Sequence, residues 1–394
     1  MIIAYHYHIP GIKRNGKILT SSQQGIFLDG LAIYFKKIIC YLHYPNRADV
    51  GTMDYTIKNS NVELISLGAH DNVYKRSLFS FKYTRNINAK EFDLFLFRGP
   101  SPLIPFLLYN YRSIQSVLLI VGDYSRENAL YKNINLKKIV VFIWSRIYKI
   151  LQDHLMENQL VIFNNRWQYE EYIDKLKYIG LASTNMISKN DYFKRVDTCK
   201  RKIKNILFVG RIDENKGLVE IAEAIIILLK KGFKVRYSVA GYEKKTGNVL
   251  NHIMDLFYKN NFENNFIYHG HVIYGRELFT IYKNADIFVN ASRSTEGFPR
   301  TIWESFAHCT PVITTSVGGI GYTIIDRRHA LFCKPRSKES IASKIEEMIK
   351  NNSLRKNLIA NGYRLALDNS FEMNIKKIYN LIFRHYRNSK QTSK

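Results

Sequence analysis

Cysteine is scarce in this chain of 394 residues, and long uncharged apolar runs are lacking. The four cysteines are widely spaced and form no C-x-x-C pair (Cys40, Cys199, Cys309 and Cys333). This spacing excludes a disulfide framework or a zinc ribbon and suits a reducing compartment. No stretch approaches the roughly 18 uncharged apolar residues of a membrane span, and the first residues lack a signal-peptide pattern. We therefore expect a soluble, cytoplasmic protein.

Acidic residues are also few, with 33 Asp and Glu against 59 Lys and Arg, so the net charge is +26. The basic excess is spread along the chain and not gathered in a tail. A diffuse positive field favours nucleotides, anionic lipids or nucleic acid as partners, and it does not choose among them. Apolar residues make up 46% of the chain, which is typical of a folded protein. The length exceeds one ordinary core, so we expect two domains of about 200 residues each.

The second half of the sequence alternates short apolar runs with longer helical patterns. The runs predict strands at 206–209, 235–240, 265–269, 286–290 and 311–314, with helices at 217–231, 275–283 and 303–309. Continuous apolar strands that alternate with helices indicate a parallel sheet covered by helices on both faces.

The first half repeats this alternation less regularly. Its patterns predict strands at 2–6, 37–41, 62–67, 93–97, 117–121 and 160–163, and helices at 22–35, 102–111, 136–155 and 167–178. Residues 182–204 have weak periodicity and end in a charged run, so we expect the domain junction near residue 198. The fold class is therefore α/β, with two similar domains. Parallel sheets bind ligands beyond the carboxyl ends of their strands, so the cleft between the domains is the expected site.

The densest group of candidate site residues is STEGFPRTIWE, Ser294–Glu304, directly after a predicted strand. Gly297 and Pro299 shape a turn into a helix, and the backbone N–H groups at a helix start suit a phosphate. Two carboxylates beside an anion, Glu296 and Glu304, would be repulsive unless they contacted hydroxyl groups. Phosphate donors combined with carboxylates for hydroxyls describe a nucleotide sugar. The alternative is that each Glu is a solvated charge near a helix start.

A second group of candidates is FVGRIDENKGL at the start of the same half. Arg211 and Lys216 follow a strand end and are bracketed by Gly210 and Gly217. Two cations at this sheet edge can hold a diphosphate, Arg through its bidentate fork and Lys as a point charge. The alternative is ordinary surface charge. The segment is neither a G-x-x-x-x-G-K-[ST] phosphate loop nor a G-x-G-x-x-G dinucleotide motif.

These segments together resemble the retaining nucleotide-sugar glycosyltransferases of glycosyltransferase family 4, also called group 1 glycosyltransferases. The resemblance spans about Asn205–Tyr379 and rests on FVGRIDENKGL, HGHV at His269–Val272, EGFPRTIWE, and PVITTSVGGIG at Pro311–Gly321. It implies the two-domain GT-B fold, in which two Rossmann-like domains have parallel sheets that face a central cleft. The acceptor-binding domain would be 1–197 and the nucleotide-sugar-binding domain 198–372. A C-terminal helix, 373–394, would cross back to the first domain.

The resemblance also implies roles for the candidate residues. Arg211 and Lys216 would bind the donor diphosphate and stabilise it as the leaving group, Glu304 would bind the ribose, and Glu296 the transferred sugar. Arg211, Lys216 and Glu296 are thus the candidate catalytic residues of the second half. The remaining donor contacts would be Gly210, the backbone at His271 and Val272 around the base, and the segment Gly297, Phe298, Pro299, Arg300 and Thr301. No metal or cofactor is expected, and no D-x-D occurs. The donor would be a UDP- or GDP-sugar, and retention of configuration follows from the family alone.

The first half departs from the family pattern. Ser21–Gln24 stands where family members commonly carry Gly-Gly. Family members often place a donor-contacting His after a first-domain strand, and here Asp123 follows one. Asp123 is therefore a candidate catalytic residue, as a sugar contact or acceptor base, with a turn residue as the alternative. Arg98 is a candidate contact for an acceptor phosphate. His6 and His8 follow the first strand, and we interpret both as structural.

A basic, apolar segment in the first half is a candidate membrane contact. In LKKIVVFIWSRIYKIL, residues 136–151, the cations Lys137, Lys138, Arg146 and Lys149 interrupt an apolar, aromatic helix. Such a helix suits an anionic bilayer, where polyprenyl-diphosphate-linked glycan acceptors reside. The protein would then lie at the cytoplasmic face of the inner membrane. The alternative is a core helix with a solvated basic edge.

The sequence therefore predicts a metal-independent retaining glycosyltransferase. It would transfer a sugar from a nucleoside diphosphate to a hydroxyl of a glycan or lipid-linked acceptor, in bacterial surface polysaccharide synthesis. One alternative is an epimerase or phosphorylase of the same fold, and another is a related scaffold without activity. A nucleic-acid-binding protein is suggested by the charge and the 27 tyrosines, but no basic aromatic recognition module stands out, so we expect no nucleic-acid partner.

Overall fold

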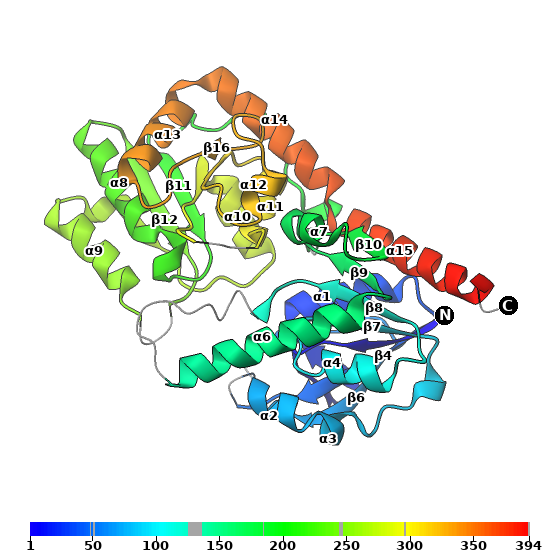
Figure 1. The fold of residues 1–394 in the computed structure, drawn as a ribbon. Helices are drawn as coiled ribbons and strands as arrows, with labels where there is room; N and C mark the ends of the chain where they lie inside the picture. The colour runs from blue at the N-terminus through cyan, green and yellow to red at the C-terminus, as the bar shows by residue number, and fades with distance from the viewer. Residues whose placement is uncertain are drawn as a thin grey trace. The chain divides into compact units, whose positions relative to one another are not determined.

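The computed structural model describes the whole chain except residues 48, 50–51, 125–135, 184, 244–246, 295–296 and 393–394. The chain divides into two compact units, Met1–Met186 with Glu372–Lys394, and Ile187–Phe371. Each unit is built on a parallel sheet (Figure 1). The predicted α/β fold class is confirmed, as is the return of the C-terminal helix to the first unit.

The first unit contains a seven-stranded parallel sheet in the order β10-β9-β8-β7-β1-β4-β6. Its strands are β1 (Ile2–His6), β4 (Lys37–Tyr44), β6 (Val62–Ala69), β7 (Leu94–Gly99), β8 (Ser116–Ile120), β9 (Leu160–Phe163) and β10 (Tyr178–Leu181). A small antiparallel sheet joins β2 (Gly11–Arg14), β3 (Lys17–Thr20) and β5 (Tyr55–Thr56). β10 and the antiparallel sheet were not predicted, and the helix predicted at 167–178 ends at Tyr172.

The helices of the first unit cover the parallel sheet. They are α1 (Ser22–Ala32), α2 (Val73–Leu78), α3 (Ser80–Thr84), α4 (Ile104–Asn110), α6 (Leu136–Met156), α7 (Arg166–Tyr172) and α15 (Phe371–Thr392). α15 runs beside β10 (Figure 1), where Gly180 leaves room for Leu381 and the ring of Tyr178 contacts His385. Because these contacts bury one face of α15, the end of the chain completes the first unit.

The second unit contains a six-stranded parallel sheet in the order β13-β12-β11-β14-β15-β16. Its strands are β11 (Lys204–Val209), β12 (Val235–Ala240), β13 (Phe266–Tyr268), β14 (Ile287–Asn290), β15 (Val312–Thr314) and β16 (Leu331–Phe332). Its helices are α8 (Leu218–Lys230), α9 (Val249–Lys259), α10 (Arg276–Asn284), α11 (Arg300–Ala307), α12 (Ile320–Thr323), α13 (Lys338–Lys350) and α14 (Asn352–Asp368).

Both faces of the second sheet are buried, as continuous apolar strands predict. Successive strand residues point to opposite faces. Ile206 and Phe208 therefore lie in one core with residues of α8 and α13, while Leu207 and Val209 lie in another with residues of α10 and α11. The sheet is thus held rigidly between two helical layers, and its carboxyl edge is free to carry loops.

The second unit begins at Ile187, before the junction expected near residue 198. The reason is a set of polar contacts that weak periodicity does not reveal. The Arg195 guanidinium donates to the carbonyl oxygens of Lys283 and Ala285 at 2.8 and 2.7 Å. Asp197 forms a two-point ion pair with Arg355, at 2.7 and 3.1 Å. These hydrogen bonds attach the connecting segment to the second unit.

Candidate donor site in the second unit

The loops at the carboxyl edge of the second sheet approach each other closely. The backbone N–H of Gly210 donates to Ala240 O at 3.0 Å, and that of Gly241 donates to Gly270 O at 2.8 Å. At Gly241, φ is +152° and a Cβ atom would lie 1.8 Å from Gly210 O, so only glycine fits. The ends of β11, β12 and β13 are therefore held side by side, with backbone groups at the sheet edge.

The loop after β11 carries the two predicted diphosphate ligands. Arg211 is exposed, and Lys216 is half-buried at the end of a short 3₁₀ turn, Glu214–Lys216. Burial lowers the pKa of Lys216 to about 8; the Asp213 charge acts against this shift, and the neighbouring Arg211 charge contributes to it. A lysine that is partly desolvated yet still protonated at neutral pH is suited to an anionic ligand.

The loop after β14 lies against the loop after β11, because β11 and β14 are neighbouring strands. The backbone N–H of Arg293 donates to Asn215 O at 2.7 Å. The Arg293 side chain binds both carboxylate oxygens of Glu220, at 2.6 and 2.9 Å. Gly217, with φ of +70°, packs so closely that a Cβ atom would lie 2.1 Å from Ala291 O. The two predicted segments are therefore fixed together at one edge.

The string Ser294–Glu304 leads into α11, but Thr295 and the predicted catalytic Glu296 lie outside the described residues. The helix begins at Arg300, with Pro299 as its N-cap and not its first residue. Gly297 and Arg300 are exposed, Thr301 is half-buried, and the Phe298 ring packs 4.5 Å from the Trp303 ring. Gly297 and Arg300 are therefore accessible near the start of α11, while Phe298 packs against the helix.

Glu304 is nearly buried, with 5% of its surface exposed. Its Oε2 accepts a hydrogen bond of 2.7 Å from Tyr282 Oη. Burial raises the pKa of the Glu304 carboxyl, and the Arg300 charge and the Tyr282 hydrogen bond act against that rise. Glu304 is thus a buried carboxyl group that Tyr282 positions through a hydrogen bond. It is not a solvated charge at the helix start, which was the alternative interpretation. Its predicted contact with ribose stays a prediction.

The predicted base-binding segment follows β13. His271 is exposed and Val272 half-buried, and the His271 ring meets the ring of Tyr242 edge-on at 5.9 Å. Tyr242 and Arg211 line a pocket of about 310 Å³ in the second unit. Tyr242 was not predicted as a site residue. Its position directly after Gly241, the glycine that follows β12, could have indicated that it lies at the sheet edge.

The candidates of the first unit differ in their accessibility. Asp123 follows β8 at the carboxyl edge of the sheet, and its Oδ2 lies 3.9 Å from Lys149 Nζ. Arg98 is fully buried, with its guanidinium 4.8 Å from the ring of Tyr7 and 4.6 Å from that of Phe27. A side chain without exposed surface cannot touch an acceptor. The prediction that Arg98 contacts an acceptor phosphate is therefore wrong.

His6 is buried in the first unit, and His8 is half-buried. His6 bonds through Nδ1 to Tyr41 O at 2.9 Å and through Nε2 to Ser101 Oγ at 2.7 Å, while His8 Nδ1 bonds to Pro100 O at 2.7 Å. Burial lowers their pKa values to about 4 and about 3, so both rings are neutral at neutral pH. Their contacts agree with the structural interpretation.

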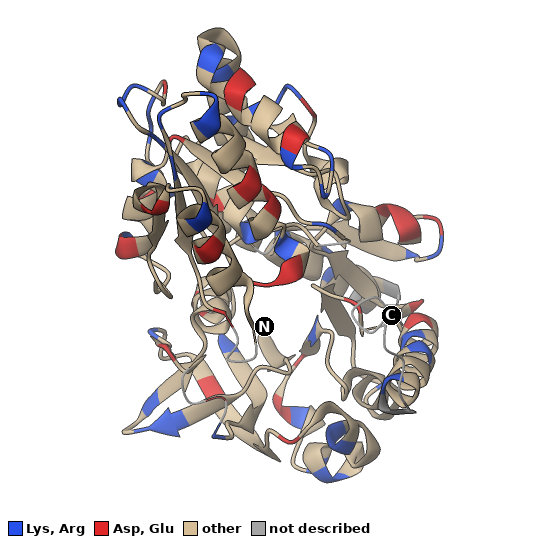
Figure 2. Cartoon of the chain, turned by 90° about the vertical axis from the view of Figure 1, so that its left-hand side faces the viewer, with Lys and Arg blue, Asp and Glu red and all other residues tan. Residues whose placement is uncertain are grey.

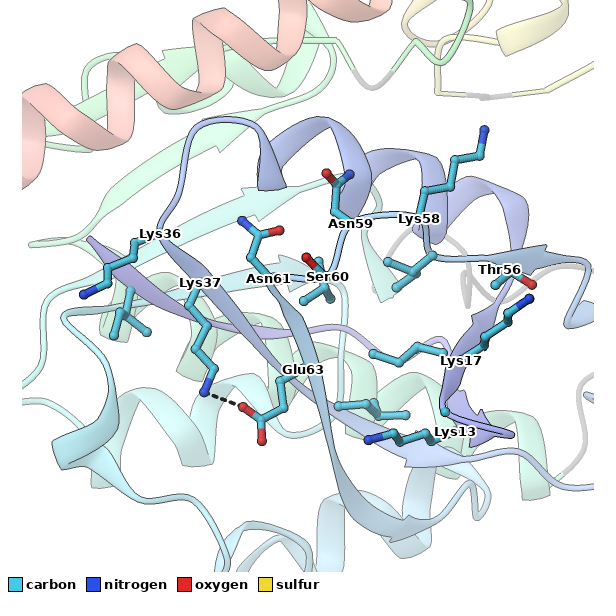
Figure 3. Close-up of a pocket in the computed structure, with 16 residues that line it drawn as sticks. Lys13, Lys17, Lys36, Lys37, Thr56, Lys58, Asn59, Ser60, Asn61 and Glu63 are labelled. Carbon is cyan, nitrogen blue, oxygen red and sulfur yellow. Dashed lines mark ion pairs between the residues drawn. The ribbon is translucent and has the colours of Figure 1, made fainter.

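Lysine and arginine residues, coloured blue in Figure 2, occur in both units. A lysine-lined pocket of about 950 Å³ lies at the amino ends of β1, β4 and β6, opposite to the carboxyl edge (Figure 3). Lys13, Lys17, Lys36 and Lys58 line it, and Lys37 pairs with Glu63 at 2.5 Å. This pocket contributes to the positive field and contains none of the predicted site residues.

Two features are absent from the described residues. No group of three or more His, Cys, Asp or Glu side chains that could hold a metal ion occurs among them. None of the helices within the described part of the chain has the length and apolar character needed to cross a membrane. The four cysteines form no disulfide.

The fold resembles that of solved GT-B glycosyltransferases over nearly the whole chain. One is HepE of Anabaena, solved in complex with UDP and glucose, which superposes with a TM-score of 0.71 at 14% identity and covers 98% of this chain and 100% of its own. Another is sucrose-phosphate synthase of Thermosynechococcus elongatus, with a TM-score of 0.70, 16% identity and 99% coverage of both chains. The architecture is therefore that of the GT-B class.

Sequence comparison relates the second unit to a known family. Residues 192–365 match the family model described as glycosyl transferases group 1. The capsular polysaccharide biosynthesis glycosyltransferase CapM of Staphylococcus aureus is 29% identical over 209 residues, which are 51% of this chain and 53% of CapM. The matched region spans about half the length of the curated relatives. The similarity to group 1 glycosyl transferases therefore falls within the second unit.

Proposed function

We propose that the protein is a retaining glycosyltransferase that transfers a sugar from a nucleoside diphosphate sugar to a hydroxyl of a glycan or lipid-linked acceptor. The observation that carries the proposal is the joining of the Arg211–Lys216 loop to the loop that leads into α11. The contacts of Gly217 with Ala291 and of Arg293 with Asn215 hold the loop that carries the two cations against the segment that leads into α11, the helix that carries Glu304.

The proposed chemistry is electrostatic. Arg211 and Lys216 bind the diphosphate and stabilise its negative charge as the glycosidic bond breaks, which requires no metal ion. Glu304 accepts hydrogen bonds from hydroxyl groups of the nucleoside through Oε1, which receives none from the described residues, while Tyr282 holds Oε2. Glu296 contacts the transferred sugar, and the backbone near His271 and Val272 contacts the base. UDP is the favoured nucleotide because HepE, which has the same fold, was solved with UDP.

Transfer assays with variants test this proposal. Lys216→Ala and Glu296→Gln should each reduce transfer from the accepted donor to background while the far-ultraviolet circular dichroism stays unchanged. Lys230→Ala, an exposed lysine at the other end of α8, is the matched control and should retain activity. Full activity in both site variants would contradict the proposal. An epimerase would instead convert the nucleotide sugar without an acceptor.

We also propose that α6 contacts an anionic membrane while the acceptor is bound. The side chains of Val140, Ile143, Ile147 and Ile150 recur at helical spacing and are 51–69% exposed, and Arg146 is exposed beside them. The core-helix alternative does not account for this exposed stripe. An apolar stripe with basic neighbours suits the interface of an anionic bilayer.

Sedimentation with vesicles tests the membrane contact. The protein should sediment with phosphatidylglycerol vesicles at low salt and be released as salt rises. Ile143→Ser with Ile147→Ser should weaken this binding, whereas Ile203→Ser, an exposed isoleucine of the second unit, should not. Absence of binding at low salt would contradict the contact and leave the proposed transfer reaction unaffected.

A further inference from the structure

A pocket that no predicted residue lines lies at the carboxyl edge of the first sheet. Its volume is about 570 Å³, and its lining includes Asn46, His70, Asn72, Arg76, Tyr124 and Trp144. We call it the Arg76 pocket. His70 directly follows β6, and Arg76 lies on α2, the next helix. The pocket therefore occupies the position where parallel sheets bind ligands.

Arg76 is buried without an ionic partner among the described residues. Only 3% of its surface is exposed, and its Nε has no hydrogen-bond partner. Its Nη1 donates one long hydrogen bond, of 3.5 Å, to His8 O. A buried guanidinium costs folding free energy unless a carboxylate or several acceptors compensate its charge. The described residues therefore do not fully compensate the positive charge of Arg76.

The two carboxylates that interact electrostatically with Arg76 also bind other groups. Asp71 accepts a hydrogen bond of 2.5 Å from Tyr83 Oη and one of 3.1 Å from Lys75 Nζ. Asp49 pairs with His70 Nδ1 at 2.8 Å. Burial lowers the pKa of Arg76, and its electrostatic interactions with Tyr124, with Asp49 and with Asp71, which itself lines the pocket, only partly offset that effect. An oxyanion of a bound ligand would supply the counter-charge for Arg76.

The other walls of the pocket suit a saccharide ring. The Trp144 ring lies 5.3 Å from the ring of Tyr124 and 5.6 Å from that of Tyr74, and Ser77 fixes it through a hydrogen bond of 3.2 Å from Trp144 Nε1. His70 adds a buried Nε2 without a hydrogen-bond partner. Apolar walls with a few placed polar groups are typical of small-molecule sites.

We propose that the Arg76 pocket binds a carboxylate or phosphate group of an anionic saccharide, which is part of the acceptor. This inference rests on the proposed transfer reaction and adds the chemical class of the acceptor. Arg76 binds the oxyanion through its fork, while Trp144 and Tyr124 pack against the apolar faces of the sugar ring.

Binding of simple saccharides, measured by ligand-observed NMR, tests the proposal. Glucuronate probes a carboxylate, glucose 6-phosphate probes a phosphate, and glucose is the neutral reference. The wild-type protein should bind at least one of the two anions about tenfold more tightly than glucose, a difference typical of one charge-assisted pair. The tighter of the two anions identifies the group. Equal binding of all three sugars would overturn the proposal.

Variants separate a site from a general effect of net charge. Arg76→Met should reduce anion binding to the level of glucose. Arg85→Met removes one positive charge from an exposed position of the same unit and should leave anion binding unchanged. Anion binding that survives in Arg76→Met would mean that the basic surface, and not the pocket, attracts the probe.

Thermal stability separates a ligand site from a structural role. Arg355 is equally buried but is paired with Asp197 at 2.7 Å, so Arg355→Met should lower the melting temperature clearly. Arg76→Met removes an uncompensated charge and should leave the melting temperature unchanged or raise it. A loss equal to that of Arg355→Met would overturn the proposal. UDP should raise the melting temperature of the wild-type protein and of Arg76→Met alike. A wild-type protein that UDP does not stabilise would instead refute the proposed function.

Discussion

The contact between Gly217 and Ala291 makes a strong prediction about how the site is assembled. Gly217 has a φ of +70°, and a Cβ atom there would lie 2.1 Å from Ala291 O, whereas real Cβ atoms essentially never come within 3.0 Å. Alanine in the left-handed region costs about 1–2 kcal/mol. Displacing packed backbone adds about 1–3 kcal/mol. Gly217→Ala should therefore destabilise the second unit by about 2–5 kcal/mol.

Gly232 provides the matched control in the same unit. It has a φ of +85° at the end of α8, and a Cβ atom there would meet nothing within 4 Å. Gly232→Ala should therefore cost only the conformational term, about 1–2 kcal/mol. The difference between the two variants measures the contact between the loops.

Urea unfolding followed by tryptophan fluorescence is the assay. Trp303 reports the second unit if Trp144 and Trp167, the other two tryptophans, are first replaced by phenylalanine. Gly217→Ala should also weaken nucleotide binding, since Ala291 must move, whereas Gly232→Ala should not. Equal destabilisation by the two substitutions would refute the close packing of these loops.

Three further outcomes follow from the same contacts. Nucleotide affinity, measured by calorimetry, should fall as the pH rises through about 8, because burial lowers the pKa of Lys216 to about 8 and the side chain loses its positive charge there. In Lys216→Arg the affinity should not change over this pH range. An equal dependence on pH in both proteins would contradict this prediction. Asp197→Asn should lower the free energy of unfolding in urea by about 3 kcal/mol, since it leaves Arg355 buried without its ionic partner. Asp255→Asn, at an exposed position, should lower it by less than about 0.5 kcal/mol. A similar loss in both variants would argue against the Asp197–Arg355 ion pair. A chelator should leave transfer unchanged, and a chelated enzyme that regains activity only with added metal would refute the metal-free mechanism.

Buried parallel strands were the part of the fold most accessible from sequence. The strands at 2–6 and 160–163 coincide with β1 and β9, because uninterrupted apolar runs identify strands that are covered on both faces. β10 was missed, since Tyr178–Leu181 is short and is paired on one side only. The antiparallel sheet of β2, β3 and β5 was missed because exposed polar residues interrupt its pattern.

The donor loops were predictable because their residues are close in sequence to strand ends. Neighbouring strands β11 and β14 bring Lys216 and Glu304 into adjacent segments, as strand–loop–helix alternation implies. The burial of Arg98 was not predictable, since the packing of Tyr7 and Phe27 around it depends on tertiary structure. The Arg76 pocket gathers residues from the segment after β6, from α2 and from α6 that share no local motif.

A thermal-shift screen against UDP-, GDP-, ADP- and CDP-sugars tests the central claim most directly. A ligand that binds only the folded state raises the melting temperature by mass action. One of these donors should raise the melting temperature of the wild-type protein, and the rise should disappear in Lys216→Ala but persist in Lys230→Ala. A panel without any shift, or a shift that is equal in all three proteins, would contradict the claim that the loops after β11 and β14 bind a nucleotide sugar.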